Sequence, residues 1–223
     1  MHSEFWHERW QRGETGWHLD SVNPLLEQNW SRLEVEPPAR VLVPLCGKSH
    51  DLGWLARRGH RVVGVELSRI AVDGFFADYG VTPEIGEASP FRRYTAGGLD
   101  ILCGDFFDLE PWHVAEVEAI YDRGSLVALP PDLRERYVSH LQGLFPKPAR
   151  MLLITFDYAQ SEMDGPPFSV GEEEVARLFG ASHRIDRLTI TDALPVNPRF
   201  LERGVTAMNE IVLELTPRVP RCS

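Results

Sequence analysis

The segment "PLCGKSHDLG", residues 44–53, places Lys48 and Ser49 directly after a glycine, and Glu66 follows about twenty residues after the turn. A lysine and a hydroxyl beside a glycine turn can bind phosphate, and an acid at that spacing can accept from the hydroxyls of a ribose. Three ligand classes are therefore open for this turn: a nucleoside triphosphate, a dinucleotide with a pyrophosphate, and a nucleoside without phosphate.

The turn has too few glycines for either phosphate ligand. A P-loop needs a glycine five residues before Gly47, where this chain has Leu42, and Pro44 removes a backbone N–H donor. The dinucleotide fingerprint Gly-x-Gly-x-x-Gly lacks its first glycine, because only Gly47 and Gly53 are present. The sequence therefore disfavours both phosphate ligands.

The third ligand class is represented by S-adenosylmethionine, and two strand ends suit it. Glu66 closes "VVGVE", where a carboxylate can accept from ribose hydroxyls. Asp105 in "CGDFFDL" can accept from the adenine amino group while Phe106 packs on the ring. The pattern favours a methyltransferase, although a surface role for Glu66 and a core role for Phe106 stay open.

A further pair, Asp122 and Arg123 in "YDRGS", is expected at the end of an inner strand, over the place where the chemistry would occur. A structural salt bridge is the alternative for this pair. Elsewhere no Ser-His-Asp, Cys-His or paired-carboxylate arrangement emerges, so no general base is assigned. Lys48 has no role in this scheme and is expected to be a solvent-facing or helix-capping charge.

The elements that must position these residues alternate between strand and helix. Strands are expected at residues 39–45, 61–67, 117–125, 149–158, 182–191 and 206–216, with a hairpin within 91–109, and helices at 51–59, 68–80, 130–145 and 169–180. This alternation predicts an α/β domain with a parallel sheet of about seven strands and a helical extension before Pro37. Ser68 should cap the helix whose Ile70, Phe75 and Tyr79 share a buried stripe.

Composition limits the partners. The 223 residues are 43% hydrophobic with a net charge of −10, which fits one globular domain and argues against nucleic-acid binding. No apolar run approaches the roughly 20 residues that span a bilayer, and no signal-peptide pattern opens the chain, so no membrane partner is expected.

The cysteines indicate the compartment and the absence of a metal site. Cys46, Cys103 and Cys222 are odd in number and scattered, which predicts a reducing cytoplasm. No pair has Cys-x-x-Cys spacing, and Cys46 with His50 alone makes a weak site, so no metal is expected.

Several segments together resemble one family. They are "FWHERWQRGETGWH", "VLVPLCGKSHDLGWLARRGHRVVGVELS", "GDFFDL", "IYDRGSLVALPPDLRERY" and "GPPFSVGEEEVARLFG". They are similar to the thiopurine S-methyltransferase family, in particular its bacterial members, from Glu4 to about Thr216.

The resemblance implies a single Rossmann-like class I methyltransferase domain. Its seven-stranded, mostly parallel sheet would carry an antiparallel edge hairpin, with an N-terminal helical lid at residues 1–36 and a core at 37–217. S-adenosylmethionine would be converted to S-adenosylhomocysteine by a cytoplasmic monomer. The acceptor would be an aromatic or heterocyclic thiol of thiopurine type, and also selenium or tellurium compounds, which would link the chain to tellurite resistance.

The resemblance also assigns residues. The implied cofactor contacts are Trp10, Leu45, Glu66, Asp105, Phe106 and Arg123, with Arg123 as a candidate for an electrostatic role. The implied acceptor contacts are Trp17, the Pro166–Pro167 pair and Arg203. Two other functions stay open: a small-molecule methyltransferase with an oxygen, nitrogen or metalloid acceptor, and a non-catalytic S-adenosylmethionine-binding protein.

Overall fold

The computed structural model describes residues 3–218. The chain forms two compact units that divide between Tyr121 and Asp122. In the described residues there are nine strands rather than the seven expected. No helix within this part of the chain has the length and apolar character needed to cross a membrane.

The first unit alternates strands and helices around a parallel centre. Its helices are α1 (Ser3–Arg12), α2 (Pro24–Asn29), α3 (His50–Arg57) and α4 (Arg69–Asp78), with 3-10 turns at η1 (Trp30–Leu33) and η2 (Phe106–Asp108). Its strands are β1 (Arg40–Val43), β2 (Arg61–Glu66), β3 (Glu84–Ala88), β4 (Phe91–Ala96), β5 (Leu99–Cys103) and β6 (Val117–Arg123). The last two residues of β6, Asp122 and Arg123, belong to the second unit. The strands lie in the order β3-β4-β5-β2-β1-β6, and β1, β2, β5 and β6 pair in parallel.

The parallel centre follows from two apolar runs. Residues 41–43 of β1 and 62–66 of β2 are buried along their whole length, as expected for strands covered on both faces. The hairpin predicted within 91–109 is confirmed as the antiparallel pair β4–β5, which closes between Ala96 and Leu99. The carboxyl ends of β1, β2 and β5 therefore lie side by side, where ligands bind in open α/β sheets.

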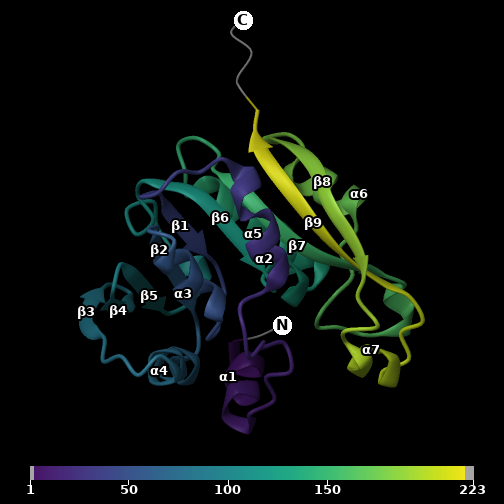
Figure 1. Ribbon diagram of the computed structural model, residues 1–223, viewed down its shortest axis with the longest axis horizontal. Helices are drawn as coiled ribbons and strands as arrows, with labels where there is room; N and C mark the ends of the chain where they lie inside the picture. Colours follow the sequence, from purple (N-terminus) through teal and green to yellow (C-terminus); the bar gives the residue numbers. More distant parts are fainter. Residues whose placement is uncertain (1–2, 219–223) are drawn as a thin grey trace, which may run out of the picture. The chain divides into compact units, whose positions relative to one another are not determined.

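The second unit is dominated by three antiparallel strands, β7 (Arg150–Tyr158), β8 (His183–Asp192) and β9 (Met208–Pro217). β9 lies between the other two, and Figure 1 shows β8 and β9 as a long pair. The helices are α5 (Pro131–Gly143), α6 (Glu172–Phe179) and α7 (Pro198–Glu202), with 3-10 turns at η3 (Leu126–Ala128) and η4 (Gln160–Glu162). β8 and β9 pair antiparallel, with a register shift between Arg187 and Thr189.

Two local expectations were wrong. The sequence pattern missed β3, because most of its residues are exposed and its polar sequence "EIGEA" lacks the alternation of a half-buried strand. Ile70 was expected in a buried stripe, but it is 49% exposed. α4 buries Phe75 as predicted, but together with Ala71, Val72 and Phe76 in place of Ile70.

Candidate functional site

The turn after β1 has an unusual backbone. Leu45 has φ +44° and Gly47 has φ +55°, so two of three consecutive residues are left-handed. This conformation costs a non-glycine residue about 1 kcal/mol, and such strain is frequent at functional sites. The Cys46 N–H donates to the Val65 carbonyl at 3.0 Å and ties the turn to β2.

Glu66 ends β2, and its side chain binds the backbone of this turn. Its carboxylate accepts from the backbone N–H of Gly47 at 2.8 Å and from that of Ser68 at 2.7 Å, and the residue is 6% exposed. Burial raises the pKa of Glu66 to about 7, against the opposing effect of its backbone donors. Each carboxylate oxygen can accept a second hydrogen bond. The predicted ribose acceptor is therefore a buried carboxylate whose oxygens can accept further hydrogen bonds.

Ser68 is a second polar group beside Glu66. It occupies the position before α4, as predicted, but its hydroxyl makes no capping bond. That hydroxyl is buried and has no hydrogen-bond partner within residues 3–218. Buried hydroxyls are nearly always paired in proteins. An unpartnered hydroxyl next to a carboxylate fits a ligand with vicinal hydroxyls, so these residues suit the ribose of S-adenosylmethionine.

Tryptophans of the N-terminal segment pack against the same turn. A Cβ at Gly47 would stand 3.3 Å from Cζ2 of Trp10, and Trp10 is 8% exposed. Trp17 meets Trp10 edge to face at 5.9 Å and Trp6 at 5.3 Å. Trp10, Gly47 and Glu66 therefore form one cluster, and Trp17 packs on Trp10.

The residues that suggested phosphate binding have roles in the fold. The Lys48 ammonium forms an ion pair with Asp78 at 2.9 Å, joining the turn to the end of α4. The Ser49 hydroxyl caps α3 by accepting from the Asp51 N–H at 3.2 Å. Burial raises the pKa of the Cys46 thiol well above its ordinary value, so Cys46 stays protonated near neutral pH.

The chain beyond β5 brings Asp105 and Phe106 close to Glu66. Cys103 pairs with Glu66 in the sheet register, and the Gly104 N–H donates to the Glu66 carbonyl at 2.9 Å. Asp105 is exposed and caps η2 by accepting from the Phe107 N–H at 2.9 Å. Phe106 is 4% exposed, which matches the core alternative as well as an adenine contact.

Asp122 and Arg123, at the end of β6, have different surroundings. Asp122 is completely buried and accepts from the Tyr137 hydroxyl at 2.6 Å and from the backbone N–H groups of Ser125 and Leu126 at 3.2 Å. These bonds fix the turn that follows the strand. Asp122 is thus structural, and Arg123 remains half-buried beside it.

The second unit brings together the predicted acceptor residues Pro167 and Arg203. The Arg203 guanidinium donates to the Pro166 carbonyl at 3.3 Å, and the Tyr158 hydroxyl donates to the Pro167 carbonyl at 2.7 Å. The proline pair is therefore held from both sides by side chains of the same unit.

Sequence reasoning missed Arg199 and Glu210. Burial lowers the pKa of Arg199, and the charges of Arg123 and Arg203 lower it further. Burial raises the pKa of Glu210, while Arg123 opposes this shift. The signal for Arg199 was present in "NPRFLERG", where a proline opens a short helix and two arginines follow at i, i+4 spacing.

In the described residues, His, Cys, Asp and Glu side chains form no group of three or more that could hold a metal ion. Cys46 is buried and Cys103 half-buried, both with free thiols, and Cys222 lies outside the described residues.

Comparison with known proteins identifies the family of this chain. The family model for thiopurine S-methyltransferase matches residues 1–218. A protein of Pseudomonas paraeruginosa named thiopurine S-methyltransferase is 51% identical over 212 residues, which cover 95% of this chain and 97% of the relative. A protein of the same name from Nitrosospira multiformis is 47% identical over 218 residues, which cover 98% and 99% of the two chains.

Solved structures show the same fold at low sequence identity. A 1,6-didemethyltoxoflavin-N1-methyltransferase of Burkholderia thailandensis, solved with S-adenosylhomocysteine, has a TM-score of 0.61 and 18% identity and covers 96% of this chain and 87% of its own. An S-adenosylmethionine-dependent methyltransferase of Anabaena variabilis has a TM-score of 0.63 and 15% identity and covers 97% and 95%. The fold is that of class I methyltransferases, and the chain belongs to the thiopurine S-methyltransferase family of S-adenosylmethionine-dependent methyltransferases.

Proposed function

We propose that the protein transfers the methyl group of S-adenosylmethionine to the sulfur of an aromatic or heterocyclic thiol, leaving S-adenosylhomocysteine. The observation that carries this proposal is the cluster of Trp10, Gly47 and Glu66, in which a buried carboxylate faces a left-handed turn covered by an indole. Relatives about 50% identical over nearly the whole chain carry the name thiopurine S-methyltransferase, which supports a thiol as the acceptor.

The cofactor would bind along the strand ends of the first unit. Glu66 accepts from the ribose hydroxyls, and the Ser68 hydroxyl gains a partner there. Asp105 accepts from the adenine amino group, beside Phe106. Leu45 lies against the methionine part, and Trp10 covers the turn. Arg123 completes the proposed set of cofactor contacts at the methionine end.

The bound cofactor supplies an electrophilic methyl group on a sulfonium. The protein then has to align the acceptor sulfur with that methyl group, which can contribute several kcal/mol to the rate, and to exclude water. Trp17, Pro167 and Arg203 are the proposed acceptor contacts. Arg123 and Arg203 favour the thiolate over the neutral thiol, because a nearby positive charge stabilises the anionic form.

A covalent route through Cys46 is disfavoured. Burial raises the pKa of its thiol well above the ordinary value, and the nearby Glu66 raises it further. The thiolate needed for nucleophilic attack is therefore scarce at neutral pH. The proposal is direct transfer from cofactor to acceptor.

The same proposal extends to the organisation of the chain and to its acceptors. Residues 1–36 act as a helical lid on one methyltransferase core at 37–217, and the protein works as a cytoplasmic monomer. Selenium and tellurium compounds are further acceptors, which would make the protein a contributor to tellurite resistance. The support for these points is the family to which the chain belongs.

The test is incubation of the pure protein with methyl-labelled S-adenosylmethionine and a panel of acceptors. The panel holds aromatic thiols, matched phenols and anilines, selenite and tellurite, and the products are separated chromatographically. Label in the thioethers supports the proposal. Label only in the ethers or amines identifies an oxygen or nitrogen methyltransferase, and cofactor binding without transfer to any acceptor identifies a non-catalytic binding protein.

A further inference from the structure

The proposed acceptor contact Pro167 belongs to a short segment of the second unit, residues 165–169, which we call the proline loop. Proline has no backbone N–H, so Pro166 and Pro167 can be held by hydrogen bonds only through their carbonyl groups. The Pro166 carbonyl accepts from the Arg203 guanidinium at 3.3 Å, and the Pro167 carbonyl accepts from the Tyr158 hydroxyl at 2.7 Å. The position of the proline pair therefore depends on side-chain donors.

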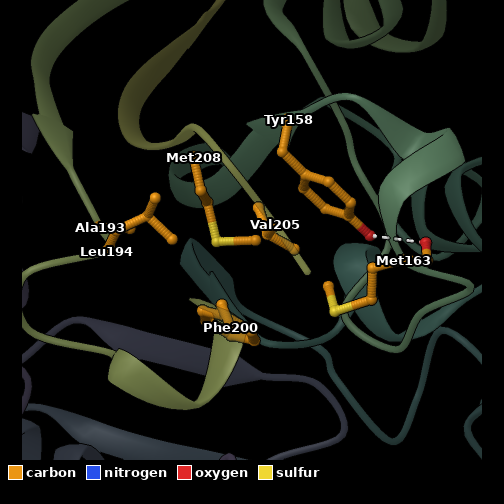
Figure 2. Packing of buried hydrophobic residues seen from close by; sticks show 7 residues of the cluster. All are labelled: Tyr158, Met163, Ala193, Leu194, Phe200, Val205 and Met208. Carbon is orange, nitrogen blue, oxygen red and sulfur yellow. Dashed lines mark hydrogen bonds between the residues drawn. The ribbon is translucent and has the colours of Figure 1, made fainter. Parts of the chain in front are cut away.

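Tyr158, the last residue of β7, is the firmer of these two donors. Its hydrogen bond is the shorter one, and its side chain is buried, whereas Arg203 is exposed to competing water. The Tyr158 ring is 7% exposed and packs in a hydrophobic cluster with Met163, Ala193, Leu194, Phe200, Val205 and Met208 (Figure 2). The packed ring fixes the place from which the hydroxyl reaches the proline loop.

Gln160 of η4 orients the Tyr158 hydroxyl. Its amide nitrogen donates to the hydroxyl oxygen at 3.1 Å and to the Met163 carbonyl at 2.6 Å. The Met163 carbonyl lies 3.5 Å from the hydroxyl and already receives this hydrogen from Gln160, so the single hydrogen of Tyr158 is left for Pro167. Gln160, Tyr158 and Pro167 thus form one directed chain of hydrogen bonds, in which each bond polarises the next.

The end of the proline loop is fixed by separate contacts. The Phe168 N–H donates to the Val127 carbonyl at 2.6 Å, and the Ser169 carbonyl accepts from Arg134 at 2.9 Å. The Ser169 hydroxyl also accepts from the Tyr158 backbone N–H at 3.0 Å, a bond that does not involve the tyrosine ring. Loss of the Tyr158 hydroxyl should therefore loosen the proline pair while the end of the loop stays attached.

We infer that Tyr158, oriented by Gln160, is a positioning residue for the methyl acceptor, which it serves by holding Pro167 in place. The inference rests on the proposed function, because Pro167 is an acceptor contact only within that proposal. A ligand binds in proportion to the fraction of molecules whose binding residues are in place. Loosening of Pro167 should therefore weaken binding of the acceptor and leave binding of S-adenosylmethionine, carried by Glu66 and its neighbours in the first unit, unchanged.

The experiment uses Tyr158→Phe, which removes the hydroxyl and keeps the ring in its cluster. KM and kcat for thiophenol are measured at saturating S-adenosylmethionine, and calorimetry gives the affinity for the cofactor. KM should rise about fivefold, the ratio that corresponds to one neutral hydrogen bond. The kcat value should change by less than about twofold, and the cofactor affinity should stay at the wild-type level, a split that a general loss of structure does not produce.

Gln160→Ala is a second variant, at an exposed residue whose loss the fold should tolerate. It should also raise KM, and the double variant should raise KM by less than the product of the two single effects, because Gln160 acts partly through Tyr158. A full product in the double variant would overturn the orienting role of Gln160.

The matched control is Tyr94→Phe, in β4 of the first unit. Tyr94 is 1% exposed, and its hydroxyl has no hydrogen-bond partner within residues 3–218, so KM should not change. An unchanged KM in Tyr158→Phe, with thiophenol still methylated, would overturn the inference and leave the proposed function standing. Equal losses in kcat and cofactor affinity would also overturn it. If the wild-type protein binds S-adenosylmethionine but methylates no thiol, the proposed function fails and the inference with it.

Discussion

The turn after β1 and the α7 region hold their polar groups in opposite ways. At the turn, a single buried carboxylate, Glu66, receives two short backbone hydrogen bonds, and the Trp10 indole packs against Gly47. Around α7, long charged side chains project from a short helix whose apolar anchor is Phe200. The first region is held together through backbone hydrogen bonds, so its geometry tolerates little change. The second presents charge on side chains, which can vary while the fold persists.

The largest effect is expected from removing the aromatic cover of the turn. Deletion of residues 1–21 should abolish methyl transfer, because Trp10 is lost from above Gly47 and the cofactor site opens to water. The measurement is label transfer from S-adenosylmethionine to an aromatic thiol. Far-UV circular dichroism should show that the remaining chain keeps its secondary structure, and the point variant Trp10→Ala should fall between the deletion and the full chain. Full activity of a folded deletion variant would refute the lid.

Glu66→Ala should weaken cofactor binding by about 30-fold or more, equivalent to about 2 kcal/mol for hydrogen bonds to a charged group. The loss also leaves the N–H groups of Gly47 and Ser68 without their partner. Calorimetric titration with S-adenosylmethionine measures the affinity, and Glu87→Ala on the exposed edge strand β3 is the control. Unchanged affinity would remove Glu66 from the cofactor site.

Arg123→Ala should lower kcat/KM for an aromatic thiol by about tenfold, because the thiolate loses a stabilising charge. The expected effect is smaller than that of Glu66→Ala, because Arg199 and Arg203 still supply positive charge in the same unit. Arg57→Ala, at the last residue of α3, should change the same constant by less than twofold. Equal effects of the two substitutions would make Arg123 structural.

The pKa of Glu66, about 7, predicts a pH-dependent affinity for the cofactor. The ionised carboxylate is the better acceptor for ribose hydroxyls, so affinity should rise by several-fold to about tenfold between pH 6 and pH 8. Calorimetry at a series of pH values measures this, and Glu66→Gln should flatten the profile. A flat profile in the wild-type protein would contradict it.

Folding stability should respond to Glu66 in the opposite direction. A carboxyl whose pKa is raised in the folded state binds its proton more tightly there than in the unfolded chain. Its contribution to stability is therefore complete below the ordinary value of 4.5 and is lost as the pH rises through about 7. Comparing the thermal denaturation of wild-type and Glu66→Gln protein across this range isolates the contribution.

The smallest effect is expected from Lys48→Met. The ion pair with Asp78 is partly exposed, with side-chain exposures of 25% and 38%, and such pairs contribute about 0–1 kcal/mol. Unfolding free energy should fall by less than about 1 kcal/mol, and methyl transfer should stay at the wild-type level. A loss of cofactor affinity comparable to that of Glu66→Ala would show that Lys48 takes part in cofactor binding.

The sequence predicted the alternation of elements well, because buried parallel strands and amphipathic helices have strong local patterns. It also disfavoured phosphate ligands, since the missing glycines are a local property of the backbone. Burial of individual faces was less predictable. Ile70 and the whole of β3 show that exposure depends on which neighbours cover an element, and neighbours are set by the tertiary arrangement.

The candidate site was also only partly predictable from the sequence. The sequence by itself determined the turn glycine, the acid about twenty residues later and the family to which both belong. Only the tertiary structure decided that Glu66 bridges Gly47 and Ser68, that Lys48 turns away to Asp78, and that Arg199 shares its surroundings with two other arginines. The physical reason is that hydrogen bonds and charges act through space over a few ångströms, between residues that the sequence leaves far apart.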